Sequence, residues 1–268
     1  MPMTIWTLTK TRRRPERGRV RRIPANSRIK RNLQAAFERQ RKALLMIIDR
    51  QTKGFAKGLP DAFVDIEAWL TANADDELQQ LLLANKPVVE LIAQTEARSV
   101  LGRVGASDVV FDVRDPYVQG AVERLALRFC AATNATTSRQ VGNAIADLRR
   151  SIGEGLDEGE GIRELTRRVQ GIFENATTYR AGRIARTETS RAVHFGQQLG
   201  AEQSGVVMGK QWIASTDGCE HCLRLHGIIV PLAGQFRHNP VPGPYSETPF
   251  PPAHPNCRCD MIEVIGER

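Results

Sequence analysis

The most constraining feature of this sequence is a proline-rich segment near its C-terminal end that lies between two groups of cysteines. The first group is Cys219-Glu-His-Cys222, and the second is Cys257-Arg-Cys259, which follows His254. The segment from His226 to Pro255 contains eight of the chain's fourteen prolines. Because such a segment has few apolar side chains with which to build a core, we expect a cross-link to hold its two ends together.

A metal ion is the cross-link that the cysteine spacing favours. A Cys-x-x-Cys pair can present both thiolates to one ion, and a second pair about 35 residues later can complete a tetrahedral site. We predict a structural zinc site with Cys219, Cys222 and Cys257 as ligands. The short Cys257-x-Cys259 spacing leaves the fourth ligand open between Cys259 and His254.

Other states of these thiols remain open from the sequence. His226 is a further candidate ligand, and either two disulfides or reduced thiols without a metal would also fit the residues. No hydrophobic segment typical of a signal peptide follows the basic N-terminus, which favours synthesis in a cytoplasm. A redox role is disfavoured because no βαβ pattern surrounds the Cys-x-x-Cys motif. Cys130 extends an apolar helical stripe, so we predict that it is a buried apolar residue.

The predicted fold is mainly α. Apolar residues recur at helical spacing, and we expect a multi-helix body whose long helix, at about 176–201, leads into a small C-terminal antiparallel β module closed by the Cys/His metal site. No apolar run approaches the length of a membrane span. The predicted segments are a basic extended arm (1–25), an N-terminal helical region (26–152), a glycine-rich connector (153–161), a second helical part (162–208) and the β module (209–268).

Two helix boundaries depend on local signals. Pro87 suits the first turn of a helix, so we predict separate helices at about 75–84 and 88–101. The apolar stripe that follows Pro116 and the stripe between Val141 and Ile152 predict two successive helices.

Glu188 interrupts the apolar stripe of the long helix. A buried carboxylate is costly unless it is paired, and Arg191 lies three residues further along the same helical surface. We predict that Glu188 anchors this helix through Arg191 or through backbone donors of the cysteine module.

The net charge of +8 arises in the N-terminal block, because residues 10–42 contain fourteen Lys and Arg against two acidic residues. Arginine forks match phosphate and carboxylate groups, so the arm is expected to contact nucleic acid or an acidic partner protein. A solvated tail without a specific role is the alternative. The arginines predicted to make these contacts are Arg12, Arg13, Arg14, Arg17, Arg19, Arg21 and Arg22.

Four motifs, in this order, resemble the Mu F-like family of phage head-morphogenesis (minor head) proteins. The resemblance extends from about Gly159 to Val264. The motifs are ARTETSRA at 185–192, WIASTD at 212–217, Cys219-x2-Cys222-x2-Leu225-His-Gly227, and PPAHPNCRC at 251–259.

The resemblance implies a structural minor head (minor capsid) protein of a tailed phage or prophage. Such a protein would be made in the host cytoplasm and would lie in the virion, at the portal or the inner capsid surface. Its partners would be the portal protein, the major capsid protein and, through the basic arm, packaged DNA. The residues alone leave two other functions open, a zinc-ribbon nucleic-acid-binding protein and a zinc-dependent nuclease. Catalysis is disfavoured because a four-ligand zinc site has no open position for substrate, and the deaminase pattern Pro-Cys-x-x-Cys is absent.

Overall fold

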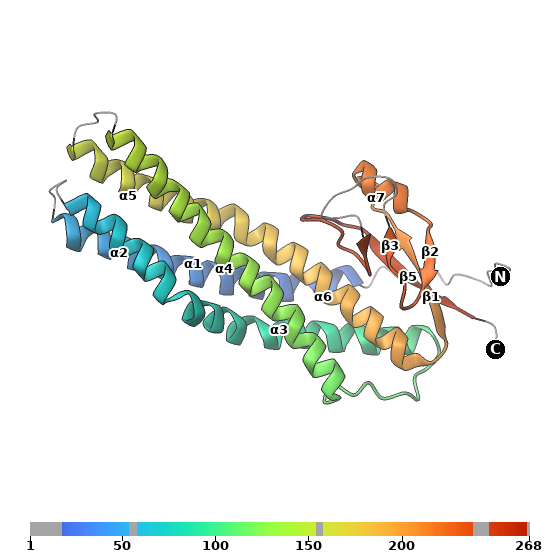
Figure 1. The fold of residues 1–268 in the computed structure, drawn as a ribbon. Helices are drawn as coiled ribbons and strands as arrows, with labels where there is room; N and C mark the ends of the chain where they lie inside the picture. Colours follow the sequence, from blue (N-terminus) through green and yellow to red (C-terminus); the bar gives the residue numbers. More distant parts are fainter. Residues whose placement is uncertain (1–17, 54–57, 154–157, 238–246, 267–268) are drawn as a thin grey trace. The chain divides into compact units, whose positions relative to one another are not determined.

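The computed structural model describes residues 18–53, 58–153, 158–237 and 247–266 (Figure 1). Its internal contacts divide the chain into two compact units. Unit 1 contains Met1–Asn26, Val88–Val122 and Ile184–Arg268, and unit 2 contains Ser27–Pro87 and Glu123–Arg183. The unit boundaries fall inside helices α1 (Gly18–Thr52), α3 (Ala74–Arg103), α4 (Pro116–Gly153) and α6 (Ala181–Ser204).

Unit 2 consists of helices packed around an apolar core. It includes α2 (Leu59–Ala72), α5 (Glu158–Asn175) and the π-helix η2 (Ala176–Arg180). Apolar residues three or four positions apart share one face of a helix, and burying that face drives the packing. The buried residues from the predicted stripes of α1 and α5 are Ile29, Leu33, Phe37, Leu44, Leu165, Val169 and Phe173.

One charged side chain, Arg180 of η2, lies in this core and is only 5 % exposed. Its guanidinium donates to Gln140 Oε1 at 2.7 Å and to Thr137 Oγ1 at 2.8 Å. It also donates to the Thr133 carbonyl oxygen at 2.9 Å and lies over the Phe37 ring. Burial lowers the pKa of Arg180, and the hydrogen bonds and ring contact offset part of the cost of desolvating its charge.

In unit 1, α3 and α6 approach closely because small residues face each other. A Cβ on Gly196 would lie 2.4 Å from the Ala93 carbonyl oxygen, and a Cβ on Gly200 would lie 2.5 Å from that of Ala97. Both distances are far below a van der Waals contact, so only glycine fits at these two positions of α6. The close approach brings α6 and α3 into one layer that supports the β module.

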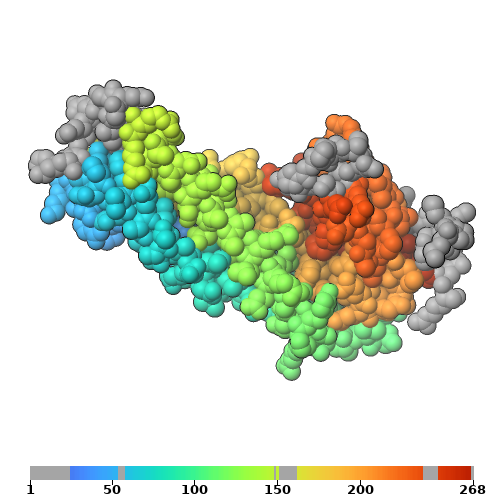
Figure 2. All heavy atoms as spheres, in the orientation of Figure 1, coloured from blue at the N-terminus to red at the C-terminus, as the bar shows by residue number. Residues whose placement is uncertain are grey.

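The β module consists of two small antiparallel sheets. In the larger sheet β1 (Val207–Ile213) is central, with β2 (Ile229–Pro231) on one side and β5 (Asp260–Ile265) on the other. The smaller sheet pairs β3 (Phe236–Arg237) with β4 (Glu247–Thr248), and the short helix α7 (Glu220–Leu225) follows β1. In Figure 2 the atoms of this module, coloured orange to red, pack against those of α6.

The structure confirms a mainly helical chain with a small antiparallel sheet at its C-terminal end. The strands of the larger sheet begin at Val207, Ile229 and Asp260. Among the described residues, none of the helices combines the length and the apolar character that a membrane crossing requires. The division of the chain into successive domains stays a prediction.

The prediction of an extended backbone was wrong for residues 18–25, which belong to helix α1. Proline fits the helical value of φ and removes a single backbone donor, and arginine is a good helix former, so Pro24 does not end the helix. Residues 1–17 of the predicted arm, with Arg12, Arg13, Arg14 and Arg17, lie outside the described residues.

Two further helix predictions were wrong: in each case the two helices that were predicted form one continuous helix. Helix α3 continues through Pro87. Proline has no N–H, so the helical hydrogen bond to the Leu83 carbonyl is lost. Leu83 is exposed, so water can satisfy that oxygen instead. Helix α4 continues from Phe129 to Val141 because no glycine or proline lies between them. Helix α5 begins at Glu158, inside the segment predicted as a connector.

Candidate metal centre

Helix α7 places the first cysteine pair. Cys219 is the N-cap residue of α7 and Cys222 lies in its first turn, so the two thiols lie on the same side of the helix. Cys219 is exposed and Cys222 is buried. Gly218 is needed before the helix because a Cβ there would lie 2.9 Å from the Ser215 carbonyl oxygen.

A tight turn places the second group. The Cys257 backbone N–H donates to the His254 carbonyl at 3.1 Å, which turns both side chains toward α7. Asn256 occupies the left-handed region with φ of 62°, a conformation that asparagine tolerates better than most residues. The Asn256 N–H donates to Thr187 Oγ1 at 3.1 Å, so α6 holds this turn in place.

The structure brings all five predicted ligands together in two overlapping sets of three. The first set is Cys219, Cys222 and His254, and the second is Cys222, Cys257 and Cys259; within each set the sulfur and nitrogen atoms lie within 4.8 Å of one another. Cys222 belongs to both sets, so it is the central residue of the cluster.

The distances resemble the edges of a tetrahedral zinc site. Bond lengths of zinc predict edges of about 3.8 Å between two sulfurs and about 3.5 Å between sulfur and nitrogen. Cys222 Sγ lies 3.7 Å from Cys257 Sγ, and His254 Nε2 lies 3.2 Å from Cys219 Sγ and 3.1 Å from Cys222 Sγ. The Cys222–Cys257 separation matches such an edge, and His254 Nε2 lies about 0.3–0.4 Å closer to both sulfurs than a zinc-bound nitrogen would.

His254 turns its Nε2 toward the cysteines. Its Nδ1 lies 2.9 Å from the Pro255 carbonyl oxygen, which can only accept, so the Nδ1–H tautomer fits this contact. In that tautomer Nε2, which faces the two sulfurs, is the ring nitrogen that can bind a metal. His226, the other histidine considered as a ligand, belongs to neither set, and its Nδ1 accepts from the Ala214 N–H at 3.2 Å.

The thiols share their protons unequally. The pKa of Cys257 is held far below its usual range, first by its hydrogen bond with Cys222 and then by its hydrogen bond with Cys259. The same hydrogen bond to Cys257 raises the pKa of Cys222. The Cys257 thiolate is thus the favoured charged form, and a thiolate is what binds metal.

The cluster is part of a small apolar core. Cys222, Cys257 and Cys259 pack with Trp212 of β1 and Phe236 of β3. The two rings meet edge to face, with their centroids 5.1 Å apart. Thiolates in such surroundings need a counter-charge, which a metal ion supplies.

The predicted anchor pair is formed in α6. Arg191 Nε lies 3.2 Å from Glu188 Oε2, and both side chains are largely buried. The role of Glu188 as an anchor for the cysteine module stays a prediction. The arginines Arg19, Arg21 and Arg22 lie in the first turns of α1.

Sequence reasoning missed a second connection between α6 and the cysteine module. His194 is fully buried, its Nδ1 lies 2.7 Å from the Ser190 carbonyl oxygen, and its Nε2 lies 3.0 Å from Asp260 Oδ1. The Ser190 carbonyl and the Asp260 carboxylate can both accept hydrogen bonds from the ring. The contact with Asp260 ties α6 to the first residue of β5, directly after Cys259. The signal in the sequence was the position of His194 directly after the apolar residues Ala192 and Val193, which indicates a buried ring.

Lys210 of β1 was also missed. It is 2 % exposed, and its Nζ donates to Gln198 Oε1 at 2.9 Å. Gln198 in turn donates to Glu202 Oε1 at 2.7 Å, so a charge on α6 balances part of the lysine's charge through the amide. Burial lowers the pKa of Lys210 to about 8, against a smaller opposing effect of Glu202.

Fold and site together define a mainly helical protein whose small β module contains a cysteine and histidine cluster that could hold a metal ion. Residues 146–262 match the family model described as Phage Mu protein F like protein. The chain therefore contains a Mu F-like domain, which confirms the resemblance in the sequence and supports a structural role in phage head morphogenesis. The matched region runs from the end of α4 to β5 and includes every residue of the cluster. No curated protein and no solved structure gave a significant match.

Proposed function

We propose that this chain is a structural minor head (minor capsid) protein of a tailed phage or prophage, acting in head assembly at the portal or the inner capsid surface. The Mu F-like match over residues 146–262 is the observation that carries the proposal. The helices of unit 2 offer extended surfaces for the portal and major capsid proteins. No catalytic step is assigned, because the residues that gather in the β module are suited to holding it together.

The Cys/His cluster is proposed to hold one structural zinc ion. Cys222 and Cys257 are the two ligands that the 3.7 Å separation of their sulfurs supports most directly. Cys219 and His254 complete the set, with Cys259 as the alternative to His254. Bound zinc would join α7 to the turn that precedes β5, and so would close the proline-rich segment between them.

The basic N-terminal segment is proposed to contact packaged DNA. Its charge is the support for this, since residues 10–42 contain fourteen basic residues against two acidic ones. Contacts to phosphates would make binding strongly dependent on salt, and deletion of residues 1–25 would remove both the affinity and most of the salt dependence.

Particle analysis tests the head assignment. Assembled virions or induced prophage heads are separated on a density gradient, and peptides of this chain are quantified beside those of the portal and major capsid proteins. We expect co-sedimentation at low stoichiometry and protection from added protease. A chain that stays soluble and absent from particles and their precursors would overturn the proposal and favour a free zinc-ribbon nucleic-acid-binding protein.

Metal analysis tests the zinc proposal separately. We expect one zinc per purified chain and loss of zinc in Cys222→Ser, because Cys222 belongs to both sets of candidate ligands. Cys130→Ala is the matched control, since Cys130 is a buried cysteine of α4 outside the cluster, and it should keep the metal. Comparison of Cys259→Ser with His254→Gln identifies the fourth ligand. Metal-free protein with four reactive thiols in the cluster would refute the proposal.

A further inference from the structure

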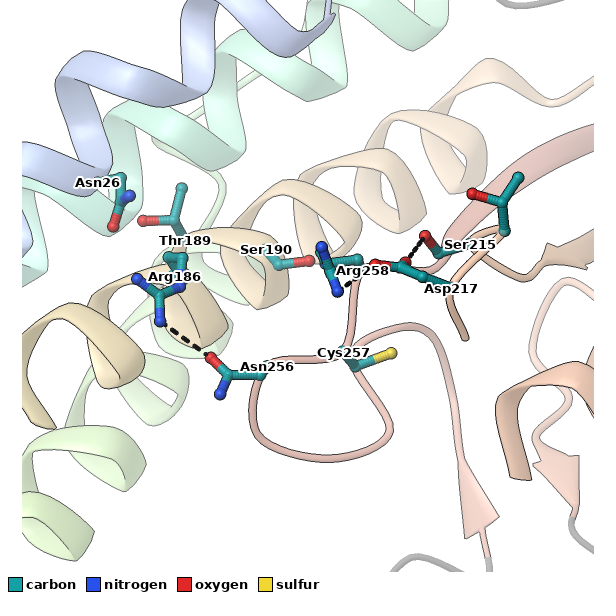
Figure 3. A pocket seen from close by; sticks show the side chains of 10 residues that line it. Asn26, Arg186, Thr189, Ser190, Ser215, Asp217, Asn256, Cys257 and Arg258 are labelled. Atoms are coloured by element: carbon teal, nitrogen blue, oxygen red, sulfur yellow. Dashed lines mark hydrogen bonds and ion pairs between the residues drawn. The ribbon is translucent and has the colours of Figure 1, made fainter. Parts of the chain in front are cut away.

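A polar cavity of about 810 Å³ lies within unit 1, beside the cysteine cluster (Figure 3). Helix α6 contributes Arg186, Thr189 and Ser190 to its wall, and Asn26 of α1 lines another side. The turn that contains Asn256 and the loop after β1 complete the lining. The Cys257 side chain also reaches the wall, but Figure 3 shows its sulfur turned away from the side chains of α6.

Two buried polar atoms of the lining have no hydrogen-bond partner among the described residues: Thr189 Oγ1 and Asn26 Oδ1. Thr189 is only 3 % exposed. A helical threonine usually donates to the carbonyl four residues earlier, as Thr133 and Thr137 do in α4 at 2.8 Å and 3.0 Å. The Thr189 hydroxyl makes no such bond, although Thr189 is one of the residues that line the cavity. It is therefore a buried polar group without a partner among the described residues, and such groups call for an explanation.

The charges of the wall favour an anion. Arg258 is paired with Asp217, which also accepts from the Ser215 hydroxyl at 2.5 Å. Arg186 donates to the neutral amide of Asn256, at 3.3 Å from Oδ1. The Arg186 guanidinium therefore keeps donors and a positive charge for a ligand.

We propose that this cavity is a binding site for a phosphate group. The Arg186 guanidinium and the hydroxyls of Thr189 and Ser190 are donors that recur in phosphate sites, and the Asn26 amide can present its N–H2 group after a 180° rotation. Three of these donors come from α6 and the fourth from α1. The phosphate belongs either to a free anion or nucleotide, or to the backbone of a nucleic acid.

None of the described residues that line the cavity belongs to the predicted arm, residues 1–25, so the proposal does not require an arm–DNA contact. The site would add a phosphate contact in the folded part of the chain. The particle experiment above can fail while this site binds phosphate, and the reverse is equally possible, so failure of one proposal is distinguishable from failure of the other.

The experiment uses the full-length chain loaded with zinc. Binding of inorganic phosphate is measured by amide and side-chain NMR shifts of Asn26, Thr189 and Asn256, and binding of a fluorescein-labelled 12-mer DNA is measured by anisotropy at low salt. Thr189→Val removes the hydroxyl at nearly constant shape, and Arg186→Ala removes the charge. Arg183→Ala is the matched control, because it removes an arginine one turn earlier on α6 that does not line the cavity.

We expect phosphate to shift these resonances, and Thr189→Val and Arg186→Ala each to raise its Kd at least fivefold while Arg183→Ala changes it less than twofold. If the same two variants weaken DNA binding, the phosphate is that of a nucleic acid; if DNA binding is unchanged, the site takes a free anion or nucleotide. Circular dichroism checks that each variant is folded. The proposal is overturned if millimolar phosphate causes no shifts, if neither folded variant weakens binding, or if a dicarboxylate binds in its place.

Discussion

Lys210 makes the stability of this protein depend on pH in a direction that can be worked out from its burial. The side chain is 2 % exposed, and burial lowers its pKa to about 8 from about 10.5. A difference of about 2.5 pKa units corresponds to about 3 kcal/mol between the two protonation states. This is the free energy by which the charged lysine disfavours the folded state at neutral pH.

The sign follows from proton binding. Between the folded pKa and the unfolded pKa, the unfolded chain binds more protons at Lys210 than the folded chain does. The free energy of unfolding therefore rises with pH across this window. The full penalty is present below pH 8, and about 2 kcal/mol of it should disappear between pH 7 and pH 9.5.

The assay compares the wild type with Lys210→Met by urea unfolding at pH 7.0, 8.0 and 9.5, with zinc present and thiols reduced. Other titrating groups are common to both chains and cancel in the difference. We expect the stability of the wild type relative to Lys210→Met to increase by about 2 kcal/mol over this range. Lys42→Met, at an exposed position of α1, should show no such change.

A constant difference between the wild type and Lys210→Met at all three pH values would refute the reasoning. It would mean that the lysine keeps its charge in the folded protein at little cost, held by Gln198 and the carboxylate of Glu202 beyond it.

Three further experiments test buried contacts of the helices. Gly196→Ala should lower the free energy of unfolding by about 1–3 kcal/mol in a denaturant titration, because its Cβ would lie 2.4 Å from a carbonyl oxygen of α3. Gly102→Ala is the control and should leave the free energy of unfolding unchanged, because a Cβ there would have no atom within 4 Å. Arg180→Met should cost about 3 kcal/mol, since it leaves its buried hydrogen-bond acceptors without their donor, and an unchanged melting temperature would contradict this. A double-mutant cycle with His194→Gln and Asp260→Asn should give a coupling of about 1–3 kcal/mol, and additive effects would show that the buried contact contributes nothing.

Local patterns predicted those parts of the fold that depend on neighbours in the sequence. Helical spacing predicted a stripe of Ile162, Leu165, Val169 and Ile172; Leu165 and Val169 are fully buried, whereas Ile162 and Ile172 are partly exposed. Helix breaks were harder to predict, because Pro87 is compatible with both a helix start and a helix interior. Whether the helix continues through Pro87 depends on whether the carbonyl oxygen that loses its donor is accessible to water. That accessibility is a property of the packed structure.

The candidate metal ligands were also predicted from spacing alone. Cys-x-x-Cys brings two thiols together on any short helix, and the distant group adds ligands only if the chain returns to the same place. The structure brings His254 within 3.2 Å of both Cys219 and Cys222, a contact that the spacing left undecided. It leaves Cys259 in a set that does not include His254.

The sequence by itself determined the helical character of the chain, a small antiparallel β module at its C-terminal end and the resemblance to Mu F-like proteins. It also determined the set of candidate ligands, without their final choice. Each of these depends on residues that are close in sequence or on their chemical type. Only the tertiary structure decided that His194 faces Asp260, that Lys210 is buried against Gln198 and that Thr189 opens into a polar cavity. These contacts form because β1 and β5 pack against α6. Burial and desolvation depend on what a fold places around a group, and no local pattern of residues contains that information.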